Sequence, residues 1–292
     1  MRRNDFIDTN EFTEQELINL MNLAIALKAC IRADYFPPLL QHRTLGLALG
    51  DCGCRMSSAF ITAMRQFGGR ILFIDRVPEV RDSRRFVENY EPYLDCIAAR
   101  TNKHEAMLTL SKYASIPVIN GGSDFNQPLQ ELSDLITMFE HLPKERRLED
   151  CKLVYEGPGN AECASLLYLT SKMGMQFVQI APSHQQLKPQ ATKIAERNIK
   201  KSGGAYLITD NAAEGFREAN FLRLPPGSSP SPLAAENGVF LVDPFLNYVT
   251  ALRAVLLLVL YRDPAAKDTL MIEKMRRTLA VKLHEVFGYG EG

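Results

Sequence analysis

The stretch KYASIPVINGGSDFNQPLQELSDLITMFE, residues 112–140, decides the fold that the sequence predicts. Its apolar run Pro117–Asn120 has the length and composition of a short buried strand. Gly121 and Gly122 favour a turn, and a helix follows that has Gln127 in its first turn and runs to Glu140. Strand, glycine turn and helix in succession form the repeating unit of a parallel α/β sheet.

The same alternation extends from this stretch in both directions. The other apolar runs are separated by helical patterns and lie at Leu45–Leu49, Ile71–Ile74, Cys96–Ala98, Lys152–Tyr155, Phe177–Ala181 and Tyr206–Thr209. Strand, helix and strand at this spacing predict parallel sheets that are covered by helices on both faces. We therefore expect the α/β class, with doubly wound parallel sheets.

A charged linker, HLPKERRLED at residues 141–150, divides the pattern into two domains. We expect an N-terminal α/β domain over residues 1–140, whose last helix joins the domains, and a second α/β domain over residues 151–245. The apolar helix that starts at Leu246 is expected to return to the first domain with the remaining residues, 246–292. The segment PPGSSPSP, residues 225–232, is expected to form neither helix nor central strand, because proline lacks the backbone donor.

Composition bears on the kind of binding partner, on cellular location and on membrane association. The 34 basic and 34 acidic residues balance, so nothing suggests a polyanion such as nucleic acid as the partner. The six cysteines are scattered and the N-terminus lacks the apolar core of a signal peptide, so we expect a reducing, cytoplasmic location. The apolar run Ala254–Tyr261 is far shorter than the ~20 residues that span a bilayer, so no membrane association is expected.

The turn GDCGCRMSS, residues 50–58, is a candidate anion site. A turn that enters a helix presents unpaired N–H groups and the positive end of the helix dipole, and Arg55 adds a charged donor. Taken alone, such an arginine is more often a solvated side chain. Cys54 is a possible nucleophile in the same turn, and a small side chain filling a tight turn is the simpler reading. No metal-ligand spacing and no cofactor fingerprint accompanies this turn, so we expect no metal and no cofactor.

Residues 112–140 resemble the segment of aspartate and ornithine carbamoyltransferases (transcarbamylases) that reads YASVPVINGLTD, HPCQ or HPTQ, and LADLLTI. AMRQFGG, residues 63–69, resembles the AM-x-QLGG of that family. Counting back from it places Gly53, Cys54, Arg55 and Met56 on the carbamoyl-phosphate motif Ser-Thr-Arg-Thr. Only the arginine of the motif is retained. The resemblance implies two transcarbamylase-type domains with the active site in the cleft between them, a small-molecule substrate and a homotrimer.

The resemblance also implies roles for residues that follow the strands. Arg100, in a match to R-T-x-x-H, would polarise the carbonyl under attack, and Gln130 would contact the carbamoyl group. Gln127 stands where the family has a histidine, and its amide still offers a donor without charge.

The acceptor side departs further from the family. Its GDGNN reads Gly157–Ala161 here, which keeps Asn160 and replaces the second asparagine with alanine. Either Leu222–Pro225 stands in for the HCLP motif, with Arg223 meeting an acceptor carboxylate, or that region is deleted and replaced by the Pro/Ser loop.

In this family an amine attacks the carbonyl of carbamoyl phosphate. Each lost donor to a developing charge costs about 2.7–4 kcal/mol, so ordinary ornithine or aspartate carbamoylation is not expected. The first hypothesis is a transcarbamylase-like group-transfer enzyme that uses carbamoyl phosphate or a related anionic carbonyl donor and a non-standard amine or amino-acid-like acceptor. The alternative is a non-catalytic homologue that acts as a ligand-binding or assembly partner. Thiol-dependent transfer at Cys54 is a third reading.

Overall fold

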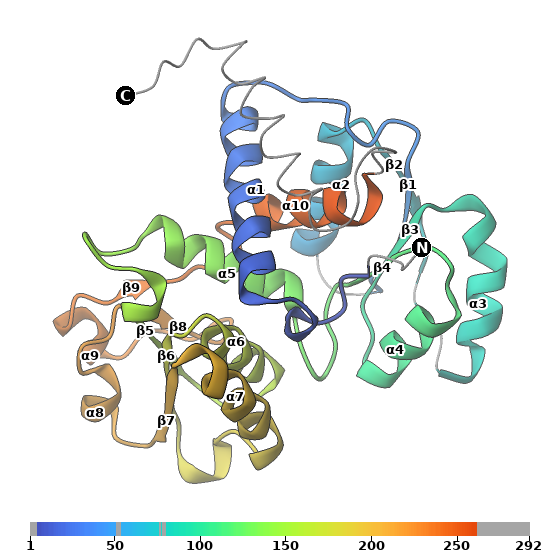
Figure 1. Ribbon diagram of the computed structural model, residues 1–292. Helices are drawn as coiled ribbons and strands as arrows, with labels where there is room; N and C mark the ends of the chain where they lie inside the picture. Colours follow the sequence, from blue (N-terminus) through green and yellow to red (C-terminus); the bar gives the residue numbers. More distant parts are fainter. Residues whose placement is uncertain (1–4, 51–53, 76, 78–79, 262–292) are drawn as a thin grey trace. The chain divides into compact units, whose positions relative to one another are not determined.

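The computed structural model describes residues 5–50, 54–75, 77 and 80–261. The chain forms two compact units, which are described separately (Figure 1). Among the described residues, unit 1 takes those within 5–7, 15–123 and 248–261, and unit 2 takes 8–14 and 124–247.

Unit 1 is built on a parallel sheet with strand order β2-β1-β3-β4. Its strands are β1 (Thr44–Ala48), β2 (Arg70–Phe73), β3 (Cys96–Ala99) and β4 (Val118–Asn120). Its helices are α1 (Glu14–Arg32), α2 (Cys54–Gln66), α3 (Ser83–Tyr90), α4 (His104–Tyr113) and α10 (Tyr248–Leu260), with 3-10 turns at Val80–Asp82 and Glu91–Tyr93. In Figure 1, α1, α2 and α10 lie on one side of this sheet and α3 and α4 on the other.

Helices on both faces explain why the central strands of unit 1 are apolar along their whole length. Every residue of β3 and β4 is buried, so these strands do not alternate between apolar and polar residues. Phe86 of α3 and Met107 and Leu110 of α4 pack beneath Ile97 and Val118 of the sheet. The chain winds from β1 outward to β2 and then returns to β3 on the opposite side of β1, so the winding direction reverses between β1 and β3.

Unit 2 is built on a parallel sheet with strand order β7-β6-β5-β8-β9. Its strands are β5 (Lys152–Glu156), β6 (Gln176–Ile180), β7 (Ala205–Thr209), β8 (Phe221–Arg223) and β9 (Phe240–Leu241). Its helices are α5 (Pro128–Glu140), α6 (Ala161–Lys172), α7 (Pro189–Ser202), α8 (Ala212–Phe216) and α9 (Pro232–Glu236), with 3-10 turns at Thr9–Glu11, Leu148–Asp150 and Ser183–Gln185. Figure 1 shows α6 and α7 on one face and α8 and α9 on the other. Here the winding direction reverses between β5 and β8.

Side-chain contacts from α5 and α6 tie residues 8–14 to unit 2. The ammonium of Lys172, in the last turn of α6, donates to the carbonyl oxygens of Thr9 at 3.0 Å and Asn10 at 2.9 Å. The hydroxyl of Thr9 also donates to the carboxylate of Glu131 on α5. These contacts fix a short segment that lies far from unit 2 in sequence.

The expected α/β class with parallel sheets is confirmed. The unit boundaries differ from the expected limits of 1–140 and 151–245, because α5, the helix expected to join the domains, packs against α6 and groups with unit 2. The part of the expected C-terminal segment beyond residue 261 lies outside the described residues. None of the helices within the described ranges is long and apolar enough to cross a membrane.

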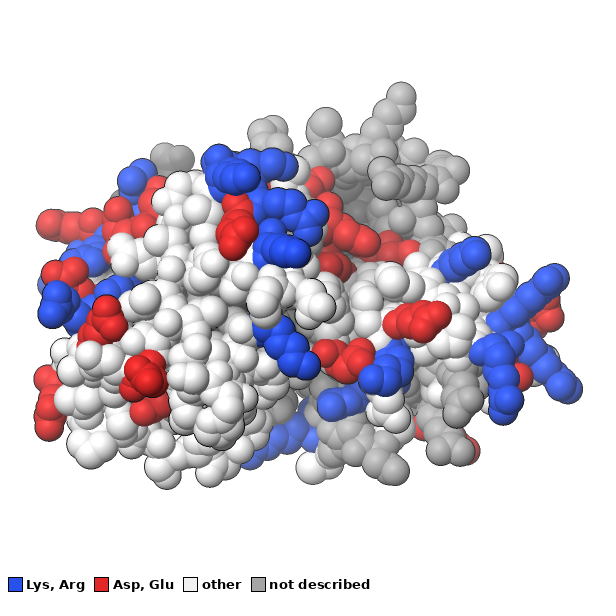
Figure 2. All heavy atoms as spheres, turned by 90° about the horizontal axis from the view of Figure 1, so that it is seen from below, with Lys and Arg blue, Asp and Glu red and all other residues white. Residues whose placement is uncertain are grey.

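Charge is mixed over the surface that Figure 2 displays. Basic and acidic side chains are intermingled on that face, which agrees with the balance of charges in the sequence.

Candidate functional site

The expected anion-binding residues of unit 1 lie near the carboxyl ends of β1 and β3, the two strands between which the winding direction reverses. Arg55 is in the first turn of α2, the helix that follows β1, and Arg100 directly follows β3. The N–H of Arg100 donates to the carbonyl oxygen of Ala48 at 3.1 Å, so Arg100 lies beside the end of β1. Both arginines are exposed. Ligands of open α/β sheets bind in the crevice at such a reversal, outside the carboxyl ends of the strands.

At the same carboxyl ends of the strands, the backbone of Gly121 closely approaches that of Ala99. The N–H of Gly121 donates to the carbonyl oxygen of Ala99 at 2.7 Å. A Cβ at Gly121 would lie 3.1 Å from that oxygen and 2.9 Å from Cδ2 of Leu49, so only glycine fits without a shift. Thr101 is 8% exposed, and its hydroxyl has no hydrogen-bond partner among the described residues. A buried hydroxyl without a partner is costly, and Thr101 directly follows the exposed Arg100 in the chain.

The remaining residues predicted for the anion motif divide as follows. Cys54 is the first residue of α2 and is exposed, and Met56 is half-buried. Gly53 lies outside the described residues. Within the described part of the chain, no group of three or more His, Cys, Asp or Glu side chains is placed to hold a metal ion.

Gln127 and Gln130 lie at the start of α5 in unit 2. Gln127 is the N-cap residue, and its N–H donates to the hydroxyl oxygen of Ser165 at 3.0 Å. Gln130 is buried, and its Nε2 donates to Oδ1 of Asp134 at 3.0 Å and to the carbonyl oxygen of Pro244. Pro128 at the first helical position favours a helix start at this point, because its missing N–H is not needed there.

The residues expected on the acceptor side lie at the reversal of the second sheet, between β5 and β8. Asn160 caps α6, and its Oδ1 accepts from the N–H of Cys163 at 3.0 Å. Gly157 follows β5 and lies against Pro225, the second residue after β8, since a Cβ on Gly157 would be 2.5 Å from Cγ of Pro225. The turns after β5 and β8 are therefore in direct contact.

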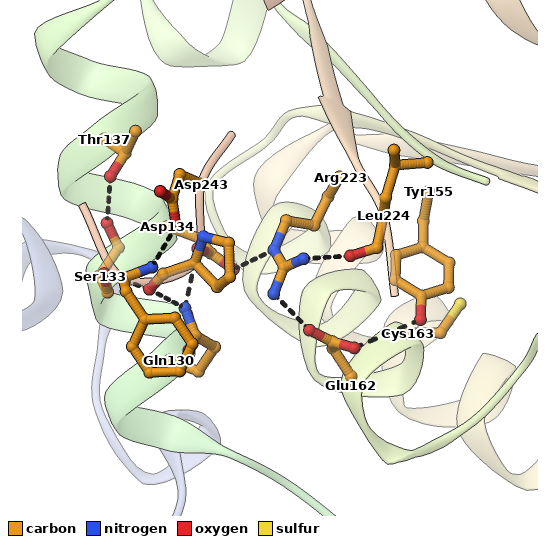
Figure 3. Close-up of polar contacts among 12 residues, drawn as sticks. Gln130, Ser133, Asp134, Thr137, Tyr155, Glu162, Cys163, Arg223, Leu224 and Asp243 are labelled. Carbon is orange, nitrogen blue, oxygen red and sulfur yellow. Dashed lines mark hydrogen bonds and ion pairs between the residues drawn. The ribbon is translucent and has the colours of Figure 1, made fainter. Parts of the chain in front are cut away.

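Arg223 ends β8 and is buried, with 2% of its side chain exposed. Its Nε lies 3.4 Å from Oδ2 of Asp134, its Nη2 donates to Oε1 of Glu162, and its Nη1 donates to the carbonyl oxygen of Leu224 (Figure 3). Burial raises the pKa of Asp134 to about 7, and Arg223 opposes this shift. Burial also raises the pKa of Glu162, which the hydroxyl of Tyr155 contacts at 3.4 Å.

A cavity of about 570 Å³ lies beside this edge, at the carboxyl ends of β5 and β6. Its charged and titratable lining comes from Glu156, His184 and Asp210, and the described residues that line it include no lysine or arginine.

Asp134, Glu162 and Pro244 were not predicted as site residues from the sequence. Asp134 carries a signal that was available, because it lies four residues after Gln130 and interrupts the apolar pattern of a buried helix. Glu162 and Pro244 carry none, since their contacts join segments that are far apart in sequence.

Comparison with known proteins identifies the family. Residues 4–140 match the family model described as the carbamoyl-phosphate-binding domain of aspartate/ornithine carbamoyltransferase. An ornithine carbamoyltransferase from Caldicellulosiruptor saccharolyticus is 32% identical over 222 residues, which cover 74% of this chain and 70% of that protein. The chain belongs to the aspartate/ornithine carbamoyltransferase family.

Other relatives extend this result. A putrescine carbamoyltransferase from Mycoplasma capricolum is 33% identical over 218 residues, which cover 70% of this chain and 60% of that protein. Among solved carbamoyltransferases, the ornithine enzyme from Pyrococcus furiosus has a TM-score of 0.76 at 24% identity and covers 90% of this chain and 98% of its own. The ornithine enzyme from Gloeobacter violaceus has a TM-score of 0.73 at 25% identity, with coverages of 88% and 99%. These structures show the carbamoyltransferase fold.

The resemblance expected from the sequence is confirmed at the level of the family. The structure brings Arg55 and Arg100 to one edge of unit 1, and Asn160 and Arg223 to the reversal of unit 2. The individual roles of these residues, including a contact of Arg223 with an acceptor carboxylate, stay predictions.

Proposed function

We propose that the protein is a carbamoyltransferase-type enzyme whose acceptor is an amine without a carboxylate, such as a diamine. The observation that carries this proposal is the burial of Arg223 between Asp134 and Glu162. An amino-acid acceptor brings a carboxylate, which needs a cationic partner. If Arg223 turned to it, two buried carboxylates would lose their counter-ion, at a cost of about 3–5 kcal/mol.

The charged residues that line the cavity beside β5 also support an amine acceptor without a carboxylate. Glu156 and Asp210 line the cavity next to it. An acidic cavity favours a cationic amine over an anionic one. The similarity to a protein named putrescine carbamoyltransferase agrees with a diamine.

In the proposed reaction the neutral amine nitrogen attacks the carbonyl carbon of carbamoyl phosphate. A carbon–nitrogen bond forms, the carbon–oxygen bond to phosphate breaks, and phosphate leaves with the electron pair while the amine proton passes to solvent or phosphate. Arg100 polarises the carbonyl oxygen, Gln127 donates to it, and Arg55 holds the phosphate. Gln130 contacts the carbamoyl group.

The first test is calorimetric titration with carbamoyl phosphate, with inorganic phosphate titrated for comparison. We expect binding of both anions, and its loss in Arg55→Ala. Arg65→Ala is the matched control, because Arg65 is exposed in the last turn of the same helix. If the wild-type protein binds neither anion, the proposed reaction is wrong.

The second test presents putrescine, ornithine and aspartate as acceptors and measures the ureido product. We expect product with putrescine and little with either amino acid. Product from ornithine or aspartate alone would contradict the proposed acceptor class. Anion binding without product from any amine would favour the non-catalytic homologue.

The family resemblance also leads us to propose a homotrimer, whose mass light scattering would measure.

A further inference from the structure

Two hydrogen bonds fix the side-chain amide of Gln130. Gln130 and Asp134 lie one turn apart on α5, and Gln130 Nε2 donates both to Asp134 Oδ1 at 3.0 Å and to the carbonyl oxygen of Pro244 (Figure 3). These bonds use both hydrogens of the amide nitrogen. The carbonyl of Pro244 only accepts, so it requires the nitrogen end of the amide, and the Oε1 end faces the other way.

Asp134 is itself held by a second set of contacts. Its Oδ2 lies 3.4 Å from Arg223 Nε, while its Oδ1 accepts from Gln130. Arg223 is held in turn by Glu162 and by the carbonyl oxygen of Leu224 (Figure 3). The two oxygens of Asp134 thus serve two different partners, and a side chain with one acceptor cannot replace both.

We propose that Asp134 is a positioning residue, which holds the Gln130 amide so that its Oε1 accepts from the amino group of the carbamoyl donor. This inference rests on the proposed function, because it assumes that Gln130 contacts the carbamoyl group. Arg223 and Glu162 act one step further away, by keeping the carboxylate of Asp134 in place within a buried setting.

A merely structural role would predict a different behaviour. Replacing a buried ion-pair cluster by apolar residues of similar volume is often neutral or stabilising, so stability alone does not require these polar groups. If Asp134 positions Gln130, its loss should weaken binding of the carbamoyl group and should not change the affinity for phosphate. The preference for carbamoyl phosphate over inorganic phosphate therefore separates the two roles.

The experiment measures this preference by calorimetry in the wild type, Gln130→Ala, Asp134→Asn and the double variant. Asparagine has one acceptor oxygen where Asp134 uses two, so it cannot satisfy Gln130 and Arg223 together. We expect Gln130→Ala and Asp134→Asn each to lower the preference about tenfold, the usual scale of one hydrogen bond to a ligand, with phosphate affinity unchanged. The double variant should be no worse than Gln130→Ala.

Glu131→Gln is the matched control. Glu131 is another buried acid on α5. Its carboxylate accepts a hydrogen bond from Thr9, whereas that of Asp134 accepts one from Gln130. This variant undergoes the same change from acid to amide and should keep the wild-type preference. If Asp134→Asn also keeps that preference while Gln130→Ala loses it, the inference is overturned and the proposed function stands.

A second readout needs neither ligand nor an Asp134 variant. In NMR spectra of the ¹⁵N-labelled protein, the side-chain amide of Gln130 is assigned by its absence in Gln130→Ala. We expect its two protons to exchange slowly with solvent, because both are hydrogen-bonded. Exchange as fast as that of an exposed glutamine such as Gln185 would overturn the positioning of Gln130. Absence of anion binding in the wild type would overturn the proposed function, and this readout would still decide the positioning.

Discussion

The two units use the same topological position in opposite ways. In unit 1 the reversal between β1 and β3 carries two exposed arginines, Arg55 and Arg100, and the buried hydroxyl of Thr101, which has no hydrogen-bond partner among the described residues. In unit 2 the reversal between β5 and β8 carries Arg223, whose guanidinium is buried against Asp134 and Glu162.

The difference lies in the exposure of the arginines. The arginines of unit 1 are exposed and are suited to an anionic ligand, whereas Arg223 of unit 2 is buried and forms ion pairs with Asp134 and Glu162. Open α/β sheets of the same winding therefore do not imply equally open sites. Substitutions at the two edges should have different consequences, on ligand binding in unit 1 and on stability in unit 2.

The largest effect is expected from Arg223→Met. This change leaves two buried carboxylates without their cation and should lower the free energy of unfolding by about 3–5 kcal/mol. Arg100→Ala, at the exposed edge, should change it by no more than about 0.5 kcal/mol. Urea denaturation of both variants checks the comparison. Equal and small losses would mean that Arg223 is not a buried counter-ion.

Glycine substitutions should also have different effects on stability in the two units. A Cβ at Gly159 would lie 2.4 Å from the backbone nitrogen of Leu187, and this backbone has little room to move. Gly159→Ala should destabilise the protein by about 1–3 kcal/mol through overpacking. Gly121→Ala should cost less, since its nearest contact, at 2.9 Å, is with a methyl group of Leu49. Thermal unfolding of the two variants gives the order, and a larger loss for Gly121→Ala would contradict it.

These contacts also show what could be predicted from the sequence. The parallel strands were predictable because β3, β4 and β5 are short apolar runs between helical patterns, a signal that is local in the chain. Arg55 and Arg100 were placed correctly beyond strand ends for the same reason.

The parts that were missed depend on distant contacts. Residues 8–14 join unit 2 through the ammonium of Lys172, which no local pattern announces. Helix α5 was expected to join the two domains, and in the structure it packs against α6 of unit 2. The burial of Arg223 requires Asp134 and Glu162, which lie 89 and 61 residues away in sequence.

A pH-dependent effect should come from Glu131 in unit 2. Burial raises its pKa from 4.5 to about 8, so the folded state holds the proton more tightly than the unfolded state. The contribution of this group to stability is therefore full below about pH 4.5 and is lost as the pH rises to about 8. Asp134, whose pKa is raised to about 7, acts in the same direction.

Glu131→Gln should remove the Glu131 part of this pH dependence. Between pH 6 and pH 9 the variant should gain stability relative to the wild type, as measured by urea denaturation at each pH. Glu105→Gln, at an exposed position of α4, is the control and should follow the wild type. A constant difference between Glu131→Gln and the wild type would show that Glu131 does not titrate in this range.

The smallest effect is expected from Cys54→Ser at the exposed edge of unit 1. Cys54 is the first residue of α2 and precedes Arg55, so it is the described thiol best placed to act as a nucleophile near an anion. In the proposed reaction the amine attacks the carbonyl directly and no thiol takes part. The substitution should therefore change carbamoyl-phosphate affinity and turnover by less than about twofold, well below the tenfold that 1.4 kcal/mol represents. Loss of turnover with unchanged affinity would instead assign covalent chemistry to Cys54, and the exposed arginines of unit 1 would then serve a thiol-dependent transfer.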